Sequence, residues 1–162
     1  MGLPGAGKTS VARAVGAELG RRVLDFDAEI SRREQQSVAD IFASKGEAHF
    51  RKLEHALTEE LRETGGMVLS PGGGWIANGD CMALLRPPGI VVYLKVRPEV
   101  AVTRMGPSAT ERPLLRQADP TAEVRRLLEA REMLYMQSNH TVSTDLVTLD
   151  EVVSSIVALA RA

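Results

Sequence analysis

The sequence predicts an α/β protein, in which a short central parallel sheet lies between two layers of helices as a three-layer α/β/α sandwich. Strand-like and helix-like segments alternate along the 162 residues, which is the pattern of parallel strands joined by helical crossovers. The chain also starts with a glycine-rich loop that leads directly into a helix-like segment. A chain of this length is expected to form one domain, here residues 1–162.

The first half of the chain is predicted to contain four helices and two strands. Apolar residues three or four positions apart indicate the helices, as with Phe50, Leu53, Leu57 and Leu61. The first strand alternates apolar and acidic residues, and the second is a short apolar run after a glycine pair. In chain order we expect a helix at 8–19, a strand at 23–27, helices at 28–34, 38–44 and 47–64, and a strand at 67–70.

The second half is predicted from helix-start signals and two further apolar runs. Pro98, Asp119 before a proline, and the capping box of Thr148 and Glu151 each mark the start of a helix. A stretch at 105–117 without periodicity, containing glycine and two prolines, predicts a loop. In chain order we expect a helix near 80–85, a strand at 90–96, helices at 98–104 and about 120–137, a strand at 140–143, and a helix at 149–160.

Composition and charge exclude several classes of function. The sequence contains 20 Lys and Arg residues and 21 Asp and Glu residues, and it has no block of like charge. We therefore expect no binding to nucleic acid or to a membrane surface. No run approaches the ~18 apolar residues of a membrane span. The single cysteine, Cys81, permits no internal disulfide, which fits a reducing compartment. We therefore predict a cytoplasmic protein and, by default, a monomer.

The first ten residues fit the pattern G-x-x-x-x-G-K-[ST] of phosphate-binding loops. Backbone N–H groups and the start of the next helix are expected to surround phosphate oxygens. Lys8 would reach the outer phosphates, and the Thr9 hydroxyl would bind the accompanying Mg²⁺. A chance match at a glycine-rich helix start is the less favoured alternative. The ATP-binding residues predicted in this loop are Gly5, Ala6, Gly7, Lys8, Thr9 and Ser10.

The usual setting of such a loop is strand, loop and helix, but only Met1 precedes it here. A parallel sheet is built around its central strand, so two neighbouring strands would lack a hydrogen-bonding partner. We therefore expect the 162-residue chain to be marginally stable, or to fill the gap with a rearranged or borrowed strand.

Two carboxylates, Asp25 and Asp27, are expected at the carboxyl end of the 23–27 strand, the sheet edge where α/β proteins bind ligands. Their two-residue spacing puts both side chains on one face of a strand. One could serve a metal through water, and the other could accept a proton from a substrate hydroxyl. Two exposed carboxylates at a strand end are the plain alternative.

A triple glycine and three arginines complete the candidate residues. Gly72-Gly73-Gly74 follows a strand end, where a ligand could approach the backbone closely, although a flexible turn would also fit. The guanidinium groups of Arg51, Arg112 and Arg131 could hold a carboxylate in a bidentate manner or stabilise a migrating phosphoryl group. Any one of these arginines alone is most often a solvated surface charge. The histidines show no metal-ligand spacing.

Taken together, these residues resemble the shikimate kinase family. The resemblance covers almost the whole chain, and it is the order and spacing of the motifs, more than the phosphate-binding loop alone, that make it specific. The supporting motifs are the loop, Asp25-Phe26-Asp27, Phe50-Arg51 with Glu54, Gly72-Gly73-Gly74, Arg112-Pro113-Leu114-Leu115, and Arg131 before Leu134-Tyr135.

The resemblance implies a P-loop NTPase fold and an ATP-dependent kinase. Such an enzyme transfers the γ-phosphoryl of ATP to the 3-hydroxyl of shikimate, a step of chorismate and aromatic amino-acid biosynthesis, with Mg²⁺ as cofactor. It also implies a substrate-binding helical region at about 28–64 and a closing lid at about 105–117. The implied catalytic residues are Lys8 and Arg112, which neutralise the migrating phosphoryl, and Asp27, which orients and deprotonates the hydroxyl.

The binding roles implied by the resemblance divide into three groups. The residues implied for shikimate are Asp27, Arg51, Arg131 and the backbone of Gly73 and Gly74. For the nucleotide, Arg104 would cover the adenine and Arg112 would act from the lid. For the metal, Thr9 would bind directly and Asp25 through water.

Two other functions are also compatible with parts of this pattern. A kinase for another small polyol or acid would keep the phosphate-binding loop but would have no need of the pair Arg51 and Arg131. A non-catalytic ligand-sensing domain of the same fold would have no need of Lys8, Asp25, Asp27 or Arg112. Because the chain has all of these residues, we favour the kinase acting on shikimate.

Overall fold

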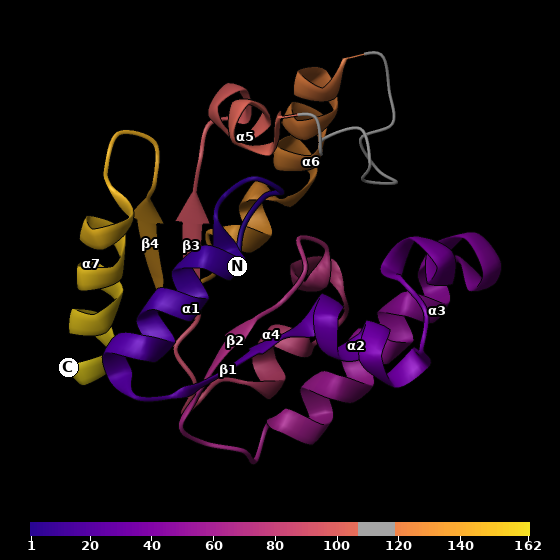
Figure 1. The fold of residues 1–162 in the computed structure, drawn as a ribbon, viewed down its shortest axis with the longest axis horizontal. Coiled ribbons are helices and arrows are strands. Elements are labelled where there is room, and N and C mark those ends of the chain that lie inside the picture. Colours follow the sequence, from indigo (N-terminus) through magenta and orange to yellow (C-terminus); the bar gives the residue numbers. More distant parts are fainter. Residues whose placement is uncertain (107–118) are drawn as a thin grey trace.

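The structure, a computed structural model, describes residues 1–106 and 119–162. Four short strands and their connecting helices alternate along the chain, and Figure 1 shows helices around the strands on several sides. The elements are α1 (Lys8–Leu19), β1 (Arg22–Asp25), α2 (Phe26–Glu34), α3 (Val38–Leu61), β2 (Met67–Ser70), η1 (Trp75–Ala77), α4 (Cys81–Leu84), β3 (Val92–Lys95), α5 (Pro98–Met105), α6 (Pro120–Tyr135), β4 (His140–Ser143) and α7 (Leu149–Arg161).

The strands form two parallel pairs, as the alternating pattern predicts. Strand β1 pairs with β2 in the register Arg22 to Met67, and β3 pairs with β4 in the register Val92 to His140. Each strand has four residues, so the predicted strand at 23–27 is shifted to 22–25 and the one at 90–96 is shortened at both ends to 92–95. Within the described residues the two pairs are separate two-stranded sheets, and Met1 alone bridges toward β3.

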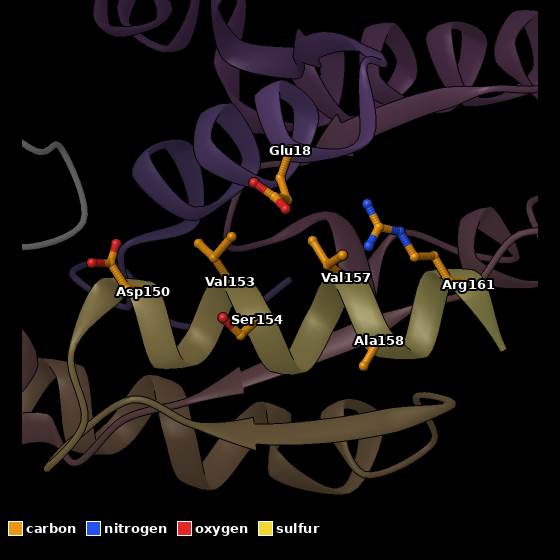
Figure 2. Close-up of a pocket in the computed structure, with 7 residues that line it drawn as sticks. All are labelled: Glu18, Asp150, Val153, Ser154, Val157, Ala158 and Arg161. Atoms are coloured by element: carbon orange, nitrogen blue, oxygen red, sulfur yellow. The ribbon is translucent and has the colours of Figure 1, made fainter.

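Helices cover the strand pairs on both sides. Helix α1 contacts β1, β2 and α7, while α5 packs on α6. Helices α2 and α3 pack on each other and extend away from α7, to the right in Figure 1. Figure 2 shows Val153 and Val157 of α7 directed toward Glu18 of α1, around a hollow of about 380 Å³.

The boundaries of the helices follow local signals in the sequence. Helix α1 begins after Gly7 and ends at Gly20, both in the left-handed region that glycine adopts readily. Helix α7 begins with the predicted capping box, in which the Thr148 hydroxyl accepts from the Glu151 N–H. The two helices expected at 38–44 and 47–64 join as α3 across a kink at Gly46, which has a φ of 81°.

The core joins the strands to the surrounding helices. Trp75 is buried, meets Phe26 edge to face at 6.4 Å between ring centroids, and donates its indole N–H to Thr58 at 2.9 Å. Tyr93 stacks on Tyr135 at 4.7 Å. These contacts place the residue after the triple glycine inside the protein. In the part of the chain that the structure describes, no helix is both long and apolar enough to span a membrane.

Candidate active site

The phosphate-binding loop has the tight backbone that its glycines predict. Gly5 and Gly7 have φ values of 78° and 83°, in the left-handed region. A Cβ atom on Gly5 would lie 2.3 Å from the carbonyl oxygen of Ala101, so α5 touches the loop where only glycine fits. Because Gly7 caps α1 without a side chain, the first N–H groups of the helix have no side-chain cap and can serve an anion.

The side chains of the phosphate-binding loop differ in their contacts and exposure. The Lys8 ammonium donates to the carbonyl oxygens of Gly2 at 3.0 Å and Leu3 at 2.8 Å, which holds it against the loop. Ala6 is buried and its N–H donates to Leu3, whereas Ser10 is exposed in the first turn of α1.

The two candidate metal-binding residues lie together. The Thr9 hydroxyl donates to the Asp25 carboxylate at 2.9 Å, although 16 residues separate them in the chain. Hydroxyl and carboxylate oxygens are the hard ligands that Mg²⁺ prefers, so this pair fits that ion. No group of three or more acidic, histidine or cysteine side chains suited to a metal occurs within residues 1–106 and 119–162.

The expected position of Asp27 on a strand is wrong. Strand β1 ends at Asp25, whose carboxylate accepts from the Ala28 N–H at 3.2 Å and so caps α2. Asp27 therefore lies in the first turn of α2, and Asp25 and Asp27 do not share a strand face. The alternation that suggested a longer strand arises because Phe26, fully buried, belongs to the core side of the helix.

The triple glycine is where the other candidate residues meet. A Cβ atom on Gly72 would lie 3.0 Å from the Asp27 carboxylate, and one on Gly74 would overlap the Arg51 guanidinium at 2.1 Å. A Cβ atom on Gly73 would lie 3.5 Å from the Gly2 carbonyl oxygen, so the triple glycine also adjoins the phosphate-binding loop. A side chain at Gly74 would therefore displace the Arg51 guanidinium, whereas one at Gly73 would meet its neighbours at ordinary contact distance.

Arg51 is fixed in this position by two carboxylates of its own helix. Its guanidinium donates to Glu54 at 2.5 Å and to Glu47 at 2.8 Å. Burial opposes the charge on Arg51, but the attraction of Glu54 and the hydrogen bonds to both carboxylates outweigh it and raise the pKa of Arg51. The side chain therefore stays a cation beside Gly74.

Arg131 approaches the triple glycine from α6. Its guanidinium donates to the Gly73 carbonyl oxygen at 3.0 Å, and the Tyr135 hydroxyl donates to the same oxygen at 3.0 Å. The two arginines thus reach neighbouring glycines from α3 and α6, which are far apart in the sequence. Such an arrangement can grip an anion between two guanidinium groups.

Glu54 is a site residue for which the sequence reasoning gave no role. Its side chain is fully buried, and burial raises its pKa even though Arg51 and Arg131 attract a negative charge there. One oxygen bonds Arg51, and the other lies 3.1 Å from the Cβ position of Gly72. The sequence did contain a signal for this role: Glu54 lies four residues after Phe50, on the apolar face of α3, where a buried carboxylate needs a charged partner.

Of the two arginines predicted to contact the nucleotide, the structure describes Arg104 but not Arg112. Arg104, in the last turn of α5, donates to the hydroxyl of Thr144 at 3.0 Å and also to its carbonyl oxygen, and so joins α5 to the end of β4. Arg112 lies outside the described residues, as does most of the predicted lid at 105–117; Met105 belongs to α5.

Comparison with known proteins agrees with this geometry. The family model described as "Shikimate kinase" matches residues 4–161. The chain belongs to the shikimate kinase family. A shikimate kinase from Pelotomaculum thermopropionicum is 36% identical over 157 residues, covering 97% of this chain and 91% of the relative. One from Burkholderia pseudomallei is 41% identical over 142 residues, covering 88% and 77% of the two chains.

A solved structure supports the same family membership. The shikimate kinase from Acinetobacter baumannii, determined in complex with shikimate, superimposes with a TM-score of 0.92 at 35% identity. The superposition covers 99% of this chain and 89% of that one. The α/β fold of P-loop type predicted from the sequence is therefore confirmed.

Proposed function

We propose that this chain transfers the γ-phosphoryl group of ATP to the 3-hydroxyl of shikimate, which gives shikimate 3-phosphate and ADP. The observation that carries the proposal is the meeting of Asp27, Arg51 and Arg131 at Gly72–Gly74, directly beside the phosphate-binding loop. A carboxylate near two guanidinium groups suits an acid that also carries a hydroxyl. Membership of the shikimate kinase family points to the same substrate.

In this proposal the two arginines hold the carboxylate of shikimate. Arg131 reaches from the side of Gly73 and Arg51 from the side of Gly74, so their planar groups can bind the two carboxylate oxygens. The Glu47 side chain is exposed, so the substrate carboxylate can replace it as a partner of Arg51, while the buried Glu54 keeps Arg51 in place. The backbone of Gly73 and Gly74 then lies beside the ring.

Proton and phosphoryl transfer would fall to residues on either side of the triple glycine. Asp27 accepts the proton of the attacking hydroxyl as general base. Lys8, with Arg112 outside the described residues, neutralises charge on the migrating phosphoryl, a reaction that depends on positioning and electrostatics. Thr9 and Asp25 are the residues that would hold Mg²⁺, which when bound supplies positive charge at the β- and γ-phosphates.

The proposal is tested by measuring ADP release in a coupled assay. We expect ADP to form with ATP, Mg²⁺ and shikimate together, and only at background level without shikimate or with other small polyols and acids. Release with a different polyol would favour the alternative kinase, and binding of shikimate without any ADP would favour the sensing domain. A cytoplasmic monomer, the remaining part of the proposal, is tested by sedimentation and fractionation.

A further inference from the structure

Tyr135 belongs to a motif that supports the family resemblance, yet the proposed phosphoryl transfer assigns its hydroxyl no task. It is the last residue of α6 and fully buried, and it follows Arg131 by four positions, so both side chains lie on one face of the helix. The Tyr135 hydroxyl and the Arg131 guanidinium each donate to the Gly73 carbonyl oxygen at 3.0 Å. A carbonyl oxygen has two lone pairs, so these two bonds use its full capacity.

The two donors to the Gly73 oxygen differ in their freedom. Arg131 is half-buried and its guanidinium has five N–H donors, so it can turn some of them toward a bound carboxylate. Tyr135 has a single O–H donor on a fully buried ring, which holds the hydroxyl in one place. When Arg131 grips an anion, the Tyr135 bond therefore stays on the Gly73 oxygen, and Gly73 keeps its position.

The Tyr135 ring is held in turn by a second tyrosine from another element. Tyr93 of β3 is also fully buried and stacks on it, with the ring centroids 4.7 Å apart and the ring planes 10° apart. Burial raises the pKa of Tyr135 against the opposing charge of Arg131, so the hydroxyl keeps the proton that it donates. Strand β3 thus fixes where the Tyr135 hydroxyl lies.

The hydroxyl groups of the two stacked tyrosines have different surroundings. That of Tyr135 bonds Gly73, whereas the buried hydroxyl of Tyr93 has no hydrogen-bond partner within residues 1–106 and 119–162. Removing the Tyr93 hydroxyl therefore breaks no bond in this part of the chain, while removing that of Tyr135 breaks the bond to Gly73. The pair separates the effect of the hydrogen bond from that of the aromatic stack.

Gly73 lies between Arg131 and the phosphate-binding loop. A Cβ atom on Gly73 would lie 3.5 Å from the Gly2 carbonyl oxygen and from Cδ of Pro4, and 3.8 Å from the Arg131 guanidinium. Helix α6 also packs against η1, which directly follows the triple glycine. A displacement of the Gly73 carbonyl group would therefore move the acceptor that orients Arg131 relative to the loop.

We propose that Tyr135 is a positioning residue for the binding of the acid substrate. Its hydroxyl holds the Gly73 carbonyl oxygen, and that oxygen orients the Arg131 guanidinium toward the substrate carboxylate. Tyr135 thus acts through Arg131 and not by contact with the substrate. This inference rests on the proposed function, in which Arg131 binds the carboxylate of shikimate.

The test compares Tyr135→Phe with Tyr93→Phe in the coupled assay of ADP release. Each variant keeps both stacked rings, but only Tyr135→Phe loses the bond to Gly73. We expect Tyr135→Phe to raise the KM for shikimate about fivefold, the scale of one hydrogen bond, and to lower kcat less than about twofold. Tyr93→Phe should leave both constants unchanged, and neither variant should change the KM for ATP.

A double-mutant cycle tests whether Tyr135 acts through Arg131. In an Arg131→Lys background, Tyr135→Phe should raise the KM for shikimate less than about twofold, because the planar guanidinium that Gly73 orients is absent. Thermal unfolding is measured on all the proteins. A general loss of packing would lower the melting temperature in both backgrounds alike, whereas the positioning role predicts a KM effect that depends on Arg131.

Three results would overturn the inference while wild-type turnover of shikimate upholds the proposed function. The first is an unchanged KM for shikimate in Tyr135→Phe. The second is an equal rise in Tyr93→Phe, which would assign the effect to the aromatic stack. The third is an equal rise with and without Arg131, which would show that Tyr135 does not act through it. Absence of ADP release by the wild-type protein would instead refute the proposed function, and the inference with it.

Discussion

Strand β2 borders two regions with different kinds of contact: the triple glycine, held by polar side chains, and a groove lined by apolar side chains. At its carboxyl end, the triple glycine receives hydrogen bonds from Arg131 and Tyr135 and is crowded by Arg51. Along its edge lies an apolar groove that β2 shares with Val92 and Leu94 of β3, and Met1 forms backbone hydrogen bonds with these two residues. In the described residues, the site geometry therefore depends on polar side chains from α2, α3 and α6, whereas the groove is bounded by apolar side chains and strand edges. Changes in the site should alter turnover and binding, and changes in the groove should alter stability.

The largest expected effect concerns Lys8 in the phosphate-binding loop. We expect Lys8→Met to abolish phosphoryl transfer, because the variant loses the positive charge nearest the phosphates. The melting temperature should change little, because Lys8 lies in a loop and its ammonium donates to the loop carbonyl oxygens of Gly2 and Leu3. The measurement is turnover at saturating ATP and shikimate. A variant that keeps more than a tenth of wild-type turnover would contradict the role of Lys8.

The second prediction separates the two arginines. Arg51→Ala and Arg131→Ala should each weaken shikimate binding by about 2–5 kcal/mol, as expected for truncating one member of a buried charge pair. Arg51→Ala should also lower the melting temperature more than Arg131→Ala, because it leaves the buried Glu54 without its partner. Calorimetric titration with shikimate and thermal unfolding measure the two effects.

The lysine variants are the matched controls for this prediction. Arg51→Lys and Arg131→Lys keep the positive charge but lose the planar fork, so they should restore binding poorly. Unchanged shikimate affinity in both alanine variants would favour a kinase for a different polyol or acid.

The third prediction concerns Asp27 as general base. Asp27→Asn should lower turnover by about 10²-fold or more, because the amide cannot accept the proton, and should leave ATP affinity unchanged. Turnover under saturating conditions and the Kd for ATP are measured on the same preparation. If ATP affinity falls while saturated turnover survives, Asp27 is a nucleotide ligand.

The fourth prediction turns to the groove. An apolar strand of about six residues fused ahead of Met1 should raise both the melting temperature and ATP affinity, because it would pair with β2 and β3 and fix the start of the phosphate-binding loop. Each buried backbone group that gains a partner is worth about 1–3 kcal/mol. The control is an extension of equal length made of glycine and serine. Equal melting temperatures and ATP affinities for the two extended proteins would contradict the prediction.

The last prediction is a pH dependence from the Met1 amino group of the 162-residue chain. Its pKa is about 5 in the folded protein against 8.0 when unperturbed, so between these values the unfolded chain binds a proton that the folded chain does not. Stability should therefore rise with pH across this window, by at most about 1.4 kcal/mol per pH unit from this group. Urea unfolding of the free and Nα-acetylated proteins between pH 5 and 8 measures it. The acetylated protein should lack this part of the slope, and identical slopes would exclude the effect.

The sequence by itself determined the local features of this protein. The phosphate-binding loop, the helix start at Pro98 and the capping box at Thr148 depend on residues within a few positions of one another, and the structure has them where they were expected. The family resemblance, which rests on the order of such motifs, was confirmed by the comparisons.

The tertiary structure decided how those pieces meet. Asp27 lies on a helix because the Asp25 carboxylate caps α2 and Phe26 is drawn into the core, and alternation along five residues cannot distinguish this from a longer strand. The role of Glu54, the shared bonds to the Gly73 carbonyl oxygen, and the single bridge from Met1 to β3 all join residues distant in the chain. Local propensity and periodicity carry no information on such pairs, because their energies arise only when separate elements pack together.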